Sequence, residues 1–187
     1  EPGKDGRPKN IIGKPIASDP RSVHEFALRI HSRFLNKADL SLQDGRFHTG
    51  EDPDANSHAA FSLSQAAEFA YRMFLLTVTQ YAPPSHNLGK LRSLARAVDP
   101  RIDEVWAPLQ KSYHRHFQLL ERAYVEARYS PTYETQADIL AWQADRIEVL
   151  IGLADALCRE HLDRLKAEHG QQNCMSSRTL VSSGDDR

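Results

Sequence analysis

The residues with the clearest chemical potential lie in the segment from Arg128 to Tyr133, which reads Arg-Tyr-Ser-Pro-Thr-Tyr. A guanidinium offers a planar fork of donors to a phosphate, and a tyrosine ring stacks on a base while its hydroxyl donates a hydrogen bond. Arg128 and Tyr129 are therefore candidate nucleotide contacts. The alternative is a helix C-terminus without a ligand, where the positive charge of Arg128 interacts favourably with the helix dipole and the tyrosines pack against the turn.

A second candidate anion site lies at residues 85–92, which read Ser-His-Asn-Leu-Gly-Lys-Leu-Arg. Ser85, or less favourably Asn87, caps a helix that begins here, and the free N–H groups of a helix start favour an anion. His86 and Lys90 lie within one turn of that end, so they are the second pair of candidate nucleotide contacts. The alternative is a capped helix with a solvated basic face.

The spacing of the histidines predicts no metal site, and no residues are expected to be catalytic. His114 and His116 are two apart, so they point to different faces of a helix, and neither has a histidine at the i,i+4 spacing of a chelating pair. His24 and His31 are seven apart, more than about 10 Å along a helix. No His/Cys ligand spacing and no paired nucleophile and base occur elsewhere.

The charged residues indicate a solvated surface rather than a binding face. Glu68 and Arg72 have i,i+4 spacing, which predicts an exposed ion pair that stabilises the helix by about 0.2–0.5 kcal/mol. The formal net charge of -1 gives no global attraction to DNA or to anionic lipid, so any anion site must be a local cluster. One run of basic residues is more typical of a solvated surface than of a groove that binds nucleic acid. It comprises Lys90, Arg92, Arg96 and Arg101.

The two cysteines and the absence of a membrane or export signal predict a cytoplasmic protein. Cys158 and Cys174 are expected to be free thiols in a reducing compartment. The sequence has no run of about 18 apolar residues, so it predicts no membrane span. It also has no basic start followed by an apolar core, so it predicts no signal peptide. The chain begins with glutamate, and residues 1–17 are rich in Lys, Gly and Pro, which predicts a linker or tail and a fragment of a longer protein.

Apolar residues recur at helical spacing along most of the chain, and no segment shows the period of a strand. We expect helices at 20–42, broken by Asp44-Gly45, and then at about 54–80, 87–98, 108–129 and 138–169, the last ended by Gly170. The helix near 54–80 carries the broadest apolar face and should lie in the middle. The predicted fold is an all-α antiparallel bundle of about five helices over 18–169, with a disordered tail at 170–187.

Three motifs within 57–160 resemble, in their order and spacing, the HEPN domain. An apolar run at 59–68 ends in Gln-Ala-Ala-Glu, His86-Asn87-Leu88 resembles the family's His-Asp-Leu turn with Asn in place of Asp, and Tyr124 to Tyr129 resembles its Tyr-x-x-x-Arg-Tyr segment. The resemblance implies an all-helical nucleotide-binding module, of the kind fused to or paired with a minimal nucleotidyltransferase.

That resemblance implies a non-catalytic nucleotide-binding and dimerisation module. The implied partners are a nucleotide such as ATP or GTP with Mg, a nucleotidyltransferase domain upstream or in another chain, and a second copy of this chain. Ribonuclease members carry Arg, four to six residues, then His, and only Arg164 and His169 have that spacing here, at the far end of the last helix. Two alternatives stay open: a HEPN-type ribonuclease and a purely structural oligomerisation domain.

Overall fold

The computed structural model describes residues 20–106, 111–130 and 132–182, and every regular element in these ranges is helical, which confirms the all-α class. The elements in chain order are α1 (Pro20–His48), α2 (Pro53–Thr79), α3 (Leu88–Val98), the short 3-10 helix η1 (Pro100–Trp106), α4 (Lys111–Tyr129) and α5 (Ala137–Ser182). The predicted linker at 1–17 lies outside the described residues.

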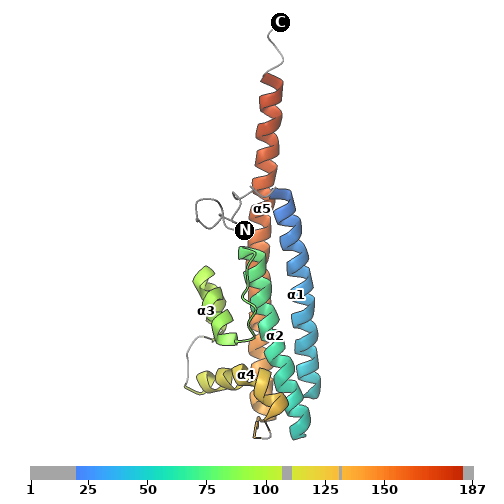
Figure 1. Cartoon of the computed structure of the whole chain (residues 1–187), viewed down its shortest axis with the longest axis vertical. Helices are drawn as coiled ribbons and strands as arrows, with labels where there is room; N and C mark the ends of the chain where they lie inside the picture. Colours follow the sequence, from blue (N-terminus) through green and yellow to red (C-terminus); the bar gives the residue numbers. More distant parts are fainter. Residues whose placement is uncertain (1–19, 107–110, 131, 183–187) are drawn as a thin grey trace, which may run out of the picture.

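The three long helices, α1, α2 and α5, lie side by side along the long axis of the molecule (Figure 1). α1 and α2 are antiparallel neighbours, while α4 crosses one end of the bundle and α3 lies beside α2. α2 is the central element, because it contacts α1, α3, α4 and α5. This confirms the prediction made from its broad apolar face.

The face of α2 is built largely of small residues, which lets its neighbours approach closely. Ala59, Ala60, Ala66 and Ala67 are all fully buried. Larger side chains fill the remaining space, and Tyr71 is also fully buried. Burial of so much apolar surface supplies the main driving force for folding.

One polar contact inside this core fixes the position of η1. The indole Nε1 of Trp106 donates to the hydroxyl of Tyr71 at 2.6 Å. Because both side chains are buried, the bond satisfies groups that would otherwise lose hydrogen bonds to water. Burial also raises the pKa of the Tyr71 phenol far above its ordinary value, so the hydroxyl stays protonated.

Helix α1 does not break at Asp44-Gly45, as the sequence analysis predicted, but continues to His48. The reason is tertiary packing. A Cβ placed on Gly45 would lie 2.7 Å from Cδ2 of Leu63 and 3.3 Å from the carbonyl oxygen of Ala59. The glycine therefore marks the point of closest approach of α1 and α2 rather than a helix end.

Gly45→Ala is expected to lower the free energy of unfolding by up to about 2 kcal/mol, which is the overpacking cost less the gain in helix propensity. Overpacking against the buried Leu63 costs about 1–3 kcal/mol, which outweighs the helix propensity that alanine gains, about 1 kcal/mol. Gly152 is the matched control, because it lies exposed within α5 with nothing within 4 Å of a built Cβ. Gly152→Ala should raise the midpoint of thermal unfolding by roughly 1–4 °C, and a rise for both variants would contradict the close approach.

Two other helix ends differ from the sequence analysis. α2 begins at Pro53, earlier than the predicted start at Asp54 or Ser57, because the Asp52 side chain accepts from the backbone N–H groups of Asp54 and Ala55. α5 was predicted to end at Gly170 and instead extends to Ser182. Residues 170–182 of the predicted disordered tail are thus helical, and 183–187 lie outside the described residues.

Candidate functional site

The ring of Tyr124 on α4 is the point where the motif residues meet. The imidazole of His86, from the connection that precedes α3, stacks on it with ring centroids 4.2 Å apart and an interplanar angle of 9°. The guanidinium carbon of Arg128 lies 4.5 Å from the same centroid and 4.6 Å from that of Phe61 on α2. The structure therefore brings His86 and Arg128, which are 42 positions apart in sequence (128 minus 86), to one aromatic ring.

Arg128 makes the contact at the end of α4 that the second of the two interpretations predicted, and part of its donor fork stays unused among the described residues. Its Nε donates to the carbonyl oxygen of Tyr124 at 2.9 Å, so it satisfies one of the free acceptors in the last turn of α4. Its guanidinium carbon also lies 5.0 Å from the ring centroid of Tyr129, which is 73% exposed. The Nη groups have no acceptor within the described parts of the chain, and this leaves the donor fork available to an anion.

His86 is held in place by a buried carboxylate. Its Nδ1 lies 2.8 Å from Oε2 of Glu68, and Oε1 of Glu68 accepts from Nε of Arg72 at 2.7 Å. Arg72 also donates from Nη2 to the carbonyl oxygen of Ser85 at 2.9 Å. Because this network joins α2 to the 80–87 connection, it sets the position of the His86 ring over Tyr124.

The prediction that Glu68 and Arg72 form an exposed surface pair is wrong. The Glu68 side chain is 4% exposed and that of Arg72 is 15% exposed. The sequence pattern showed the i,i+4 spacing, but the connection at 80–87 folds back over both residues and covers them. A carboxylate taken out of water in this way needs its partners, so each contact matters more than it would on a surface.

At the start of α3, a side-chain cap and a carboxylate lie close to the backbone N–H groups that the sequence analysis offered to an anion. Asn87, rather than Ser85, is the N-cap, and its Oδ1 accepts from the backbone N–H of Lys90 at 2.7 Å. The Glu121 carboxylate lies so close to Gly89 that a side chain there would collide with it, and its negative charge opposes a second anion. The Lys90 side chain is exposed and contacts none of the aromatic residues around Tyr124 among the described residues.

A wide open groove runs between α4, residues 130 and 132–136, and the first residues of α2. Its volume is about 1340 Å³, and Arg128 and Tyr129 both line it. Arg115 and Arg122 line it from α4, while Tyr133 lines it from the segment after α4. His86 and Lys90 do not line this groove.

The residues that line the groove carry a small net positive charge, +1 from three arginines and two carboxylates with His116 neutral. The three arginines face two carboxylates, Asp54 and Glu134, and Arg122 also lies 3.6 Å from Glu126. A local cluster of this kind attracts an anion without giving the protein a basic surface.

Tyr133 adds a buried phenol to the groove. Its hydroxyl donates to the carbonyl oxygen of Leu119 at 3.4 Å, a long bond that leaves room for another partner. Burial raises the pKa of Tyr133 to about 12, so the phenol is a neutral donor and acceptor near pH 7.

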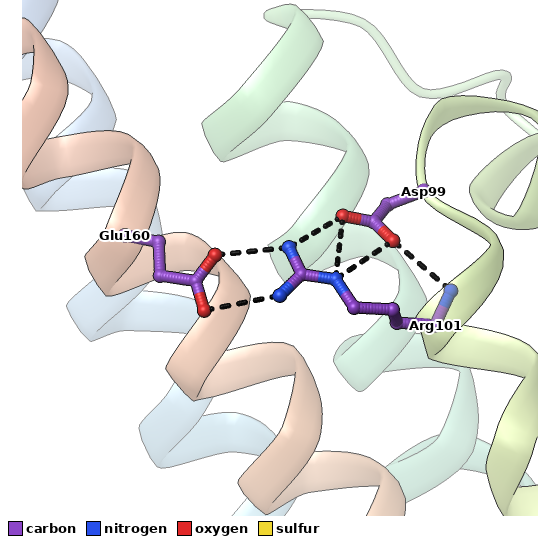
Figure 2. A network of polar contacts seen from close by, with 3 residues as sticks. All are labelled: Asp99, Arg101 and Glu160. Atoms are coloured by element: carbon purple, nitrogen blue, oxygen red, sulfur yellow. Dashed lines mark hydrogen bonds and ion pairs between the residues drawn. The ribbon is translucent and has the colours of Figure 1, made fainter.

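The basic run on α3 and η1 is paired with carboxylates, which agrees with its interpretation as a surface. Nε of Arg92 donates to Asp103, and Nη1 of Arg96 lies 3.7 Å from the same carboxylate. Figure 2 shows Arg101 between Asp99 and Glu160, with Nη2 2.8 Å from one carboxylate and 2.9 Å from the other. Of the four basic residues, Lys90 alone lacks an ion pair within the described ranges.

The Arg-His spacing of the ribonuclease alternative does not lie at the groove. Arg164 and His169 lie on the C-terminal half of α5, which extends beyond the other helices (Figure 1). The side chain of His169 is outside the described residues. Arg164 does not line the groove.

Cys158 has the character of a structural thiol. It is a free, fully buried cysteine whose Sγ lies 3.8 Å from the carbonyl oxygen of Met73. Burial raises its pKa to about 12, so the reactive thiolate is scarce near neutral pH. The side chain of Cys174 lies outside the described residues.

The sequence analysis did not choose Arg115 and Arg122 as site residues, and it named Tyr124 and the run that contains Phe61 only as family motifs. Two signals could have found some of them. Tyr124 is at the i,i+4 spacing from Arg128, and Arg115 and Arg122 are seven apart, which places them on nearly the same side of α4. Phe61 carries no such signal, because only the packing of α2 against α4 brings it beneath the guanidinium.

Comparison with known proteins bears on the family of the chain. Along the described ranges, no helix combines the length and apolar character that crossing a bilayer requires. None of the curated proteins matches the chain. The family model of the HEPN domain matches residues 24–162, which include α2, α3, η1 and α4 entirely. The chain therefore belongs to the HEPN domain family.

Proposed function

We propose that this HEPN domain is a non-catalytic module that binds a nucleotide in the groove beside Arg128 and Tyr129. The observation that carries the proposal is the joint placement along one groove of a guanidinium whose Nη donors have no acceptor among the described residues, an exposed aromatic ring and two further arginines. These are the groups that phosphate and base recognition needs. A larger basic surface, which a long nucleic acid would need, is reduced by the carboxylates paired with Arg92, Arg96 and Arg101.

Each group in the groove has a role that follows from its position. Arg128 would bind a phosphate through its Nη donors, because Nε is already committed to the Tyr124 carbonyl oxygen. Arg122 and Arg115 would attract the remaining phosphate charge. Tyr129 is exposed enough to stack on a base, and the Tyr133 hydroxyl would supply a hydrogen bond.

His86 would act indirectly, through Tyr124. Its ring is stacked on Tyr124 and tied to Glu68, so it fixes the aromatic surface over which Arg128 lies. Lys90 is a more distant contact, one turn into α3, and would contribute only charge. Mg²⁺ would accompany the nucleotide phosphates, as is usual for nucleoside triphosphates.

We further propose that the module serves a nucleotidyltransferase domain, in the same polypeptide or in a partner chain, in the cytoplasm. The HEPN family membership supports this association. We also propose a homodimer formed through a helical face. Leu94 and Val98, one turn apart on α3 and 36% and 41% exposed, support an apolar contact surface of this kind.

Thermal unfolding of the full chain with a panel of nucleotides and MgCl₂ tests the proposal. A nucleotide at 100 times its dissociation constant stabilises by about 2.7 kcal/mol, which should raise the midpoint by roughly 5–10 °C for a domain of this size. If neither ATP nor GTP moves the midpoint, alone or with the transferase present, the proposed function is wrong. A flat panel together with a stable dimer would favour a structural oligomerisation domain.

A further inference from the structure

A cluster of three potential metal ligands lies where α1 ends and α2 begins. Asp44, His48 and His58 each present one ligand atom, and these atoms all lie within 4.8 Å of one another. Nδ1 of His48 is 3.4 Å from Oδ1 of Asp44, and Nε2 of His58 is 3.1 Å from Oδ2. The rings of the two histidines are 4.3 Å apart between centroids.

The continuation of α1 through Gly45 creates this cluster. Asp44 and His48 have i,i+4 spacing, so they share one face of the helix only because the helix does not break between them. His58 then reaches the same point from α2, which packs tightly against α1 at Gly45. The cluster therefore depends on the same close approach as the core.

The ligand atoms lie close enough together for one divalent cation, with each histidine near a different oxygen of Asp44 and all three ligand atoms within 4.8 Å of one another. Zinc bonds to histidine nitrogen and carboxylate oxygen at about 2.0–2.2 Å, so two ligand atoms of a tetrahedron lie about 3.3 Å apart. The two Asp44–histidine separations lie within 0.2 Å of that edge. Two imidazoles and one carboxylate are also a ligand set that zinc uses at sites with an open fourth position.

The surroundings of the cluster support a built site. The hydroxyl of Ser62, on a side chain that is 5% exposed, donates to Oδ2 of Asp44 and so orients the carboxylate as a second ligand shell would. The Asp44 and His58 side chains are 44% and 51% exposed, which leaves a path for an ion and a water ligand. His48 Nδ1 also lies 3.0 Å from the Asp44 carbonyl oxygen, and binding requires that its ring proton be carried on Nε2 instead.

We propose that Asp44, His48 and His58 bind one zinc-type divalent cation, which clips the end of α1 to the start of α2. The site uses none of the residues that line the nucleotide groove. Its failure would therefore leave the proposed nucleotide function untouched. A clip at this turn would stabilise the α1–α2 pair in the folded chain over the unfolded one.

Calorimetric titration of the full chain with ZnCl₂ near neutral pH tests the site. One zinc per chain is expected, and zinc at 100 times its dissociation constant should raise the unfolding midpoint by roughly 5–10 °C. His58→Ala should weaken zinc binding by more than about 100-fold, since it removes a direct ligand, while Ser62→Ala should weaken it by roughly 10- to 100-fold. Co²⁺ should give the visible absorption of a four-coordinate ion in the parent and lose it in His58→Ala.

His114→Ala is the matched control, because His114 is an exposed histidine on α4 that lies outside the cluster. Its ring is hydrogen-bonded to the side chain of Gln118. Its zinc affinity should equal that of the parent chain. Circular dichroism of each variant establishes that its helices are formed. No zinc uptake by the folded parent, or equal affinity in the parent and in His58→Ala, would overturn the proposal.

Discussion

Arg128→Ala is expected to weaken binding of ATP or GTP roughly 10- to 100-fold, because a charge-assisted hydrogen bond contributes about 1.5–3 kcal/mol. The guanidinium lies over Phe61, Tyr124 and Tyr129, with its Nη donors unused within the described structure. The variant should fold normally, because Arg128 is exposed at the end of α4. Isothermal titration of parent and variant measures the loss directly.

Two further variants separate the shape of the guanidinium from its charge. Arg128→Lys keeps the charge but loses the planar fork, so its affinity should fall between those of the parent and Arg128→Ala. Arg101→Ala removes an arginine that lies outside the groove, between Asp99 and Glu160, and should leave nucleotide affinity unchanged. Equal nucleotide affinities for the parent and Arg128→Ala would show that Arg128 does not contact the nucleotide.

Glu68→Ala is expected to lower the free energy of unfolding by about 3 kcal/mol, since breaking a buried ion pair leaves its partner charge uncompensated. Arg72 would lose its carboxylate partner and His86 its anchor. For a domain of this size the midpoint of unfolding should fall by roughly 6–12 °C. Thermal or urea unfolding followed by circular dichroism checks this result.

Glu25→Ala is the matched control for Glu68→Ala. Arg21 and Glu25 are also an arginine–glutamate pair at i,i+4 spacing, but their side chains are 72% and 64% exposed. An exposed pair contributes about 0–1 kcal/mol, so this variant should unfold close to the parent. Similar losses for the two variants would show that the buried position of Glu68 has no special effect on stability.

Most of the fold could be predicted from the periodic spacing of apolar residues and from the residue types that end helices. The central place of α2 followed from its broad apolar face, and Asp99-Pro100 marked the end of α3 as expected. The failures came where tertiary contacts override a local signal. Gly45 looked like a helix end, but it is the residue that lets α1 pack against Leu63. Gly170, likewise, lies within α5.

The candidate site could be predicted only in part. Arg128 and Tyr129 line the groove, as their residue types suggested, and His86 meets Arg128 at the Tyr124 ring. Lys90 does not line the groove, because no residue of α3 belongs to its lining. The i,i+4 spacing of Glu68 and Arg72 gave no information on how deeply their side chains are buried, because the 80–87 connection covers them only in the folded chain.

Photolabelling of the full chain with 8-azido-ATP tests the central claim, a nucleotide base held against Tyr129 in the groove. Trypsin releases residues 129–146 as one peptide, which carries both Tyr129 and Tyr133. The label is expected on this peptide, and excess ATP should abolish it. Label on peptides from other parts of the chain, or no label from either 8-azido-ATP or 8-azido-GTP that the parent nucleotide competes away, would contradict the account.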